Sequence, residues 1–145
     1  MINARKRIAV LLPLSLVLLA GCSKPAAPAP AVAAEPETLS RTEFTNRIEN
    51  YFEYEPLHSG KASPVRIHLT DLSDGTPVEK AEVTLTVRPK GSIQTAVETV
   101  SKVGKVTGIY VAELTIPKAG DYDIEFHIKN AKLDEHLPLS NFKVE

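Results

Sequence analysis

The sequence is poor in the residues that build covalent cross-links and soft metal sites. Its 145 residues include one cysteine, one methionine and no tryptophan. A single cysteine excludes an intramolecular disulfide, a CxxC redox site and a thiolate metal cage. The 17 basic and 18 acidic residues are balanced, so there is no excess positive charge to bind a nucleic-acid backbone. The composition leaves a small binding or structural protein.

The N-terminus has the pattern of a secretory signal peptide. Arg5, Lys6 and Arg7 precede an uncharged run over 8–20. These 13 residues are fewer than the roughly 20 that a membrane-spanning helix needs, and Pro13 interrupts them. We therefore predict a signal peptide over 1–21.

The four residues that end this segment are Leu19, Ala20, Gly21 and Cys22. They resemble the lipobox of bacterial lipoproteins. The resemblance implies cleavage before Cys22, a diacylglyceryl group on its sulfur and acylation of the new N-terminus. Several acyl chains on one residue give stable membrane anchoring. The alternative is an ordinary secretory signal with an incidental run of small residues.

Lipidation would place the mature chain on the periplasmic side of a membrane. Ser23, rather than aspartate, follows the cysteine, which favours the outer membrane if the host is Gram-negative. Removal of 1–21 takes away three basic residues and leaves 14 basic and 18 acidic ones, a net charge of −4. The only methionine is lost as well.

Residues 22–40 have the composition of a tether. Four prolines alternate with alanines, at Pro25, Pro28, Pro30 and Pro36. Such composition favours an extended polyproline II spacer of ~3.1 Å per residue between the lipid and the next domain. A filler sequence with no required length is the alternative.

Residues 41–145 show the patterning of a single all-β domain. Apolar and polar residues alternate in short runs that are separated by turn residues such as 73–77 and 89–92. The strands predicted in this way cover 49–55, 64–72, 82–88, 93–100, 109–116, 122–129 and 137–144. Seven short strands in about 100 residues predict an antiparallel β-sandwich of the immunoglobulin-like type.

A tyrosine near the start of one strand supports this prediction. The run 119–122, with Gly120 and Tyr122, resembles a tyrosine corner. In that motif the phenol hydroxyl donates to upstream backbone and pins the connection between the two sheets. We therefore assign structural roles to Gly120 and Tyr122.

A set of short motifs in this domain carries a family resemblance. The positions are Thr42, Phe44, Thr45, Arg47, Phe52, Glu53, Tyr54, Pro56, Leu57, Gly60, His68, Thr70, Gly108, Ile109 and Tyr110. Residues 42–130 resemble the N-terminal domain of periplasmic adaptor proteins from heavy-metal resistance-nodulation-division efflux pumps. The lipoyl-like domain and helical hairpin of those adaptors have no counterpart in these 145 residues. We therefore expect the accessory domain alone.

Four histidines are the main candidates for transition-metal ligands. The alternation places His68 and His127 on outward faces of strands in opposite sheets, so they are not expected to share an ion. His58 follows the first strand and His136 precedes the last one, so those two meet only if both loops lie at one end of the sandwich. We predict at most a weak surface site for Zn²⁺ or Cu²⁺, with His58 and His68 as candidates, and no resident cofactor.

The sequence does not indicate an enzyme. It has no Gly-x-Ser-x-Gly nucleophile motif, and its cysteine is expected to carry lipid. We expect a membrane-anchored, non-enzymatic accessory module that binds an efflux-pump component or another envelope protein. The alternatives are a periplasmic metal-binding protein that uses surface histidines and a structural envelope lipoprotein.

Overall fold

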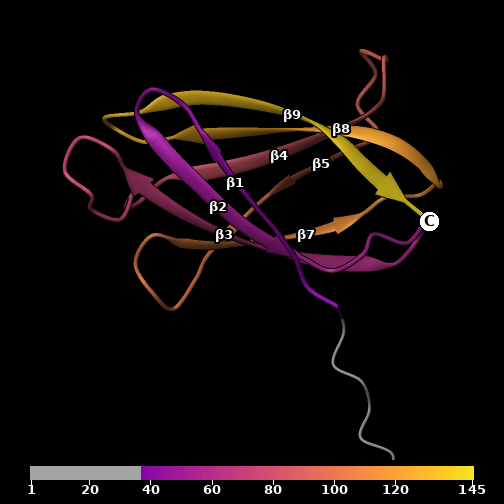
Figure 1. Cartoon of the computed structure of the whole chain (residues 1–145), viewed down its shortest axis with the longest axis horizontal. Helices are drawn as coiled ribbons and strands as arrows, with labels where there is room; N and C mark the ends of the chain where they lie inside the picture. Colours follow the sequence, from indigo (N-terminus) through magenta and orange to yellow (C-terminus); the bar gives the residue numbers. More distant parts are fainter. Residues whose placement is uncertain (1–36) are drawn as a thin grey trace, which may run out of the picture. The chain divides into compact units, whose positions relative to one another are not determined.

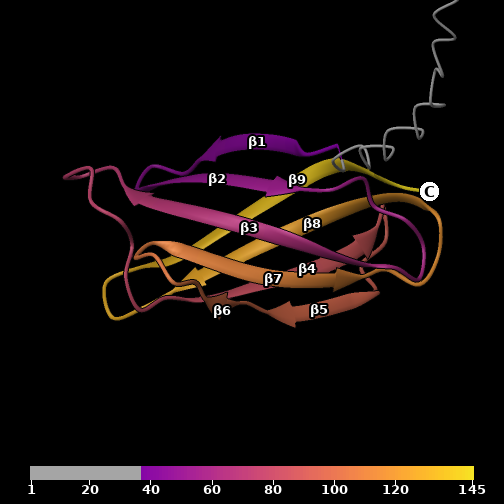
Figure 2. The same cartoon turned by 90° about the horizontal axis from the view of Figure 1, so that it is seen from below.

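The computed structural model describes residues 37–145, which form two antiparallel β-sheets packed face to face (Figure 1, Figure 2). The predicted signal peptide, the lipobox with Cys22 and the tether up to residue 36 lie outside the described residues. Within 37–145 no helix is long and apolar enough to cross a membrane. The nine strands are β1 (Leu39–Phe44), β2 (Ile48–Tyr54), β3 (Ala62–Asp71), β4 (Glu82–Pro89), β5 (Val97–Val100), β6 (Lys102–Val103), β7 (Ile109–Thr115), β8 (Gly120–Lys129) and β9 (Asp134–Val144).

The strand order is that of an immunoglobulin-like sandwich. Sheet 1 has the order β1-β2-β3-β7-β6, and sheet 2 has the order β5-β4-β8-β9. Leaving out β1, these orders match the A-B-E-D and C′-C-F-G sheets of immunoglobulin-like domains. The chain changes sheets three times, between β3 and β4, between β5 and β6, and between β7 and β8. The predicted fold class is confirmed.

The core fills the space between the two sheets with the inward side chains of the alternating strands. In β8, Tyr122, Ile124, Phe126 and Ile128 are buried while the residues between them face outward. The ring of Phe126 packs against Phe52 of the opposite sheet, with centroids 4.9 Å apart. Burial of each large apolar side chain stabilises the fold by about 1.5–3 kcal/mol. The buried residues of β8 thereby fix the positions of the outward residues between them.

The structure differs from the predicted strands at the sheet edges. It has nine strands rather than seven, because β1 and β6 gave no alternating pattern. Strand β1 begins at Leu39, inside the predicted tether, and its residues are mostly exposed. It is held to sheet 2 by Arg41, which donates to the carbonyl of Ser140 at 2.9 Å and lies 4.8 Å from the ring of Phe142. An edge strand of this kind needs backbone pairing but few core residues, so its sequence carries little signal.

Two predicted strands differ from the observed ones by three residues or more at one end. The segment predicted over 93–100 is a strand only from Val97, and Ile93 is 95% exposed in the preceding loop. The last strand begins at Asp134 rather than Leu137. The extra residues at its start include His136, which therefore lies in a strand and not before one.

The tyrosine corner has the geometry expected of the motif. The hydroxyl of Tyr122 donates to the carbonyl of Lys118, four residues upstream, at 2.8 Å. Gly120 has a φ of 147°, in the region that favours glycine over other residues. Both residues lie where the chain passes from β7 in sheet 1 to β8 in sheet 2.

Candidate metal centre

Two histidines and an aspartate come together on the outer face of sheet 2. His127 lies in β8, and Asp134 and His136 lie in the neighbouring strand β9. The three residues are called the histidine cluster below. Their side chains are 32%, 53% and 56% exposed, respectively, so the cluster faces solvent.

The short hairpin between β8 and β9 creates this arrangement. The side-chain oxygen of Asn130 accepts hydrogen bonds from the backbone N–H groups of Lys132 and Leu133, at 2.8 and 2.9 Å. These bonds close the turn and set the register, which pairs His127 directly with His136. Directly paired side chains in antiparallel strands point to the same face of the sheet.

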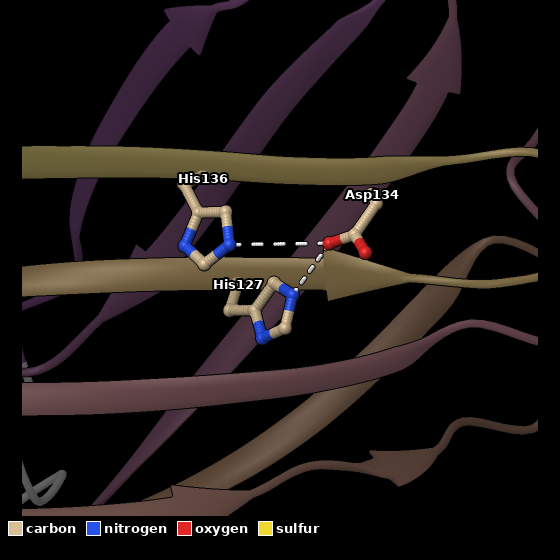
Figure 3. A group of neighbouring side chains, drawn as sticks. All are labelled: His127, Asp134 and His136. Atoms are coloured by element: carbon tan, nitrogen blue, oxygen red, sulfur yellow. Dashed lines mark hydrogen bonds and ion pairs between the residues drawn. The ribbon is translucent and has the colours of Figure 1, made fainter.

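The ligand atoms of the cluster converge on one point (Figure 3). Nε2 of His127 lies 2.8 Å from Oδ1 of Asp134, and Nε2 of His136 lies 3.9 Å from the same oxygen. All three ligand atoms are within 4.8 Å of one another. The two imidazole rings are stacked, with centroids 4.1 Å apart and planes 12° apart.

These distances suit a divalent transition metal. Zn–N and Zn–O bonds of about 2.0–2.2 Å in a tetrahedral site separate the ligand atoms by about 3.3–3.5 Å. The observed separations of 2.8 and 3.9 Å lie on either side of that range. The two histidine nitrogens are up to 4.8 Å apart, and their ring planes are only 12° from parallel. Because a shared ion must lie close to the plane of each ring, binding requires the exposed His127 ring to rotate as well as to move closer.

A second carboxylate orients His136. Oε1 of Glu125 lies 2.7 Å from Nδ1 of His136, and Oε2 accepts a hydrogen bond from Arg88 at 2.7 Å. These bonds, first from Arg88 and then from His136, hold the pKa of Glu125 below its usual value. An ionised carboxylate only accepts hydrogen bonds, so Nδ1 carries a hydrogen and Nε2 is the nitrogen that faces Asp134. Metal-bound histidines donate their second ring N–H to a carboxylate, a backbone carbonyl or water, and Glu125 is a partner of the first kind.

Asp134 is ionised and already surrounded by donors. The hydrogen bonds from His127 and then Lys129 lower the pKa of Asp134 to about 2. In this state His127 donates its Nε2 hydrogen to the carboxylate. A metal ion would take the place of that hydrogen, so metal and proton compete for Nε2.

The two predicted ligands lie elsewhere. His68 is on the outer face of β3 in sheet 1, where its ring meets Tyr51 edge-on at 5.3 Å and its Nε2 lies 3.9 Å from Glu53. It is therefore on the opposite sheet from His127, as predicted. Neither His68 nor His58 belongs to the histidine cluster.

His58 and His136 lie at opposite ends of the sandwich, so the condition for their meeting is not fulfilled. Leu57 bridges to Val144, and Ser59 donates to the carbonyl of Glu145, so His58 lies beside the end of β9. His136 is near the start of that strand, eight residues or about 26 Å away. The signal that was missed is the turn over 130–133, since a hairpin closed there pairs 127 with 136.

Comparisons with family models, with curated proteins and with solved structures give no match for this chain. The similarity to efflux adaptor domains therefore stays a prediction from the sequence motifs.

Proposed function

We propose that this protein is a lipid-anchored, non-enzymatic accessory domain that presents a binding site for a divalent transition metal on the periplasmic side of a membrane. The observation that carries the proposal is the convergence of two imidazole nitrogens and one carboxylate oxygen within 4.8 Å. The carboxylate of Glu125 behind His136 adds support, because such a partner fixes the ring for metal binding.

The donor set defines the class of ion. Imidazole suits Zn²⁺, Cu²⁺ and Ni²⁺, whereas Mg²⁺ and Ca²⁺ prefer sites made of oxygen. Three protein ligands leave at least one coordination position for water or for a ligand from another molecule. Because the site is exposed and has an open position, a ligand from another molecule can reach the bound ion and take it over.

Isothermal titration of the mature chain without its lipidated cysteine, residues 23–145, tests the metal site. We expect one Zn²⁺ or Cu²⁺ ion per chain with a micromolar dissociation constant, and no heat from Mg²⁺ or Ca²⁺. His127→Ala and His136→Ala should each weaken binding by more than about tenfold. His68→Ala is the matched control, because it removes an outward-facing histidine from the opposite sheet.

Two results would contradict the proposal. One is a folded wild-type chain that binds none of these ions. The other is binding that survives His127→Ala and His136→Ala but is lost in His68→Ala or His58→Ala, which would favour the site predicted from the sequence.

The lipid anchor follows from Leu19, Ala20, Gly21 and Cys22. Membrane fractionation of cells that express the full chain tests it. The wild type should sediment with membranes, whereas Cys22→Ser should carry no acyl chains and should appear in the soluble fraction. Equal partitioning of the two would contradict lipidation at Cys22.

An association with metal efflux is supported by the motifs in residues 42–130. Deletion of the gene should then lower tolerance to the ion that the site binds, and restoration should require His127 and His136. Unchanged tolerance, together with a membrane pull-down that recovers no efflux component, would favour a structural envelope lipoprotein.

A further inference from the structure

A lysine sits against the carboxylate of the histidine cluster. Lys129 lies in β8 two residues after His127 and is paired directly with Asp134 of β9. Its ammonium is 2.9 Å from Oδ2 of Asp134, while Oδ1 of the same carboxylate faces the two histidines. One carboxylate oxygen of Asp134 thus faces the two histidines, and the other is held by the positive charge of Lys129.

This placement opposes metal binding at the cluster. An ion bound to Oδ1 would lie about 2 Å from that oxygen and so about 5 Å from the ammonium on Oδ2. In water and at physiological ionic strength, repulsion between charges of +2 and +1 at that separation weakens binding by about 3- to 10-fold. Lys129 also competes directly for the negative charge of Asp134.

The geometry points to Lys129 as a residue that lowers the affinity of the metal site and speeds release of the ion. This inference rests on the proposed metal-binding function and adds how tightly the site holds its ion and how fast it releases it. The cluster is a site of exchange, which takes up a divalent ion and yields it to a stronger set of ligands. Its exposure supports the same conclusion, because Asp134, His136 and Lys129 are each more than half exposed to an incoming ligand.

Substitutions at Lys129 separate its charge from its length and its hydrogen bond. Lys129→Met removes both the charge and the donor, Lys129→Gln keeps a donor without charge, and Lys129→Arg keeps the charge. Lys143→Met is the matched control, since it removes a lysine of β9 that pairs with Glu145 at 3.1 Å, at the far end of the strand. The side chains of Lys129 and Lys143 are 57% and 74% exposed, so all four variants should fold.

The measurements are the Zn²⁺ dissociation constant by titration and the release rate by stopped-flow mixing with a chelator, both on residues 23–145. Lys129→Met and Lys129→Gln should bind Zn²⁺ about 3- to 10-fold more tightly and release it correspondingly more slowly. Lys129→Arg and Lys143→Met should match the wild type. High salt should reduce the difference between Lys129→Met and the wild type.

The outcomes distinguish this inference from the proposed function. If the wild type binds Zn²⁺ and Lys129→Met binds it no more tightly, the role of Lys129 is overturned and the metal site stands. Equal tightening in Lys143→Met would also overturn it, because the effect would come from net charge. If neither the wild type nor Lys129→Met binds any ion, both proposals fall.

Discussion

His127 and His136 face each other across β8 and β9, with their rings stacked at a centroid distance of 4.1 Å. The stacking brings both Nε2 atoms to the same side, where they meet one oxygen of Asp134 (Figure 3). All three residues belong to one hairpin. The candidate metal centre is therefore a property of the hairpin and its register.

Removal of the carboxylate behind His136 should weaken metal binding. Glu125→Ala leaves Nδ1 of His136 without its acceptor, so the ring can rotate and exchange tautomers. We expect the dissociation constant for Zn²⁺ to rise by about 10- to 100-fold, measured by titration. Glu98→Ala is the control, because Glu98 stands in the same row of sheet 2 with only Thr86 between it and Glu125. An equal effect of both substitutions would indicate a change in the general charge of the face.

Asn130 should control both stability and the metal site. Its side chain accepts from Lys132 and Leu133 and donates to the carbonyl of Glu79 at 3.0 Å. Asn130→Ala should lower the free energy of unfolding in urea by about 1–2 kcal/mol.

The same variant should also weaken Zn²⁺ binding, because the hairpin register is less firmly held. Asn46→Ala, at an exposed loop asparagine between β1 and β2, should change neither quantity. A destabilised Asn130→Ala chain that still binds Zn²⁺ like the wild type would show that the strands alone hold the register.

Tyr122 should matter for stability and not for metal binding. Tyr122→Phe keeps the buried ring and removes the hydrogen bond to Lys118. We expect a loss of about 1 kcal/mol in the free energy of unfolding and an unchanged Zn²⁺ dissociation constant. Tyr51→Phe, which removes a hydrogen bond to Glu53 on the outer face of sheet 1, should cost less. A neutral effect of Tyr122→Phe would show that the corner does not stabilise the crossing between the sheets.

The carboxyl group of Asp134 should titrate with a pKa of about 2 in the metal-free protein. His127→Ala should raise this pKa, and so should Lys129→Met, because each removes a hydrogen bond to the carboxylate. Carbon-13 NMR of the side-chain carboxyl during an acid titration gives the value. His68→Ala should leave it unchanged, and a wild-type pKa in the ordinary range would contradict the contacts of the cluster.

The lowered pKa of Asp134 also predicts how acid changes the stability of the fold. Asp134 has a lower pKa in the folded chain than its ordinary value of 3.8, so its ionised form favours folding. The contribution is complete above pH 5 or so and is lost as the pH falls from about 4 to 2. It should be absent in His127→Ala combined with Lys129→Met.

The central strands of the sandwich were predictable from the sequence. Runs such as 64–72 and 122–129 alternate because one side of each strand faces the core, and burial imposes that period of two. The edge strands β1 and β6 were not predictable in this way. They are held by pairing with a neighbour's backbone, and backbone pairing leaves no pattern in the side chains.

The outward orientation of His127 was likewise evident from alternation, but its partners were not. Alternation states which face a residue occupies and not which residue stands beside it. His136 was assigned to a loop, since the last strand was expected to begin at Leu137. Without the pairing of β8 with β9, the sequence indicates only His58 and His68 as candidate ligands.

The sequence by itself determined the fold class, the inward and outward faces of the main strands, and the motif on which the lipid anchor is proposed. Local composition and short-range order carry that information. Only the tertiary structure decided which polar side chains meet, because the meeting of His127 with His136 and Asp134 depends on the register of the β8–β9 hairpin. A shift of one residue in that register would turn the β9 ligands to the core face and dismantle the site.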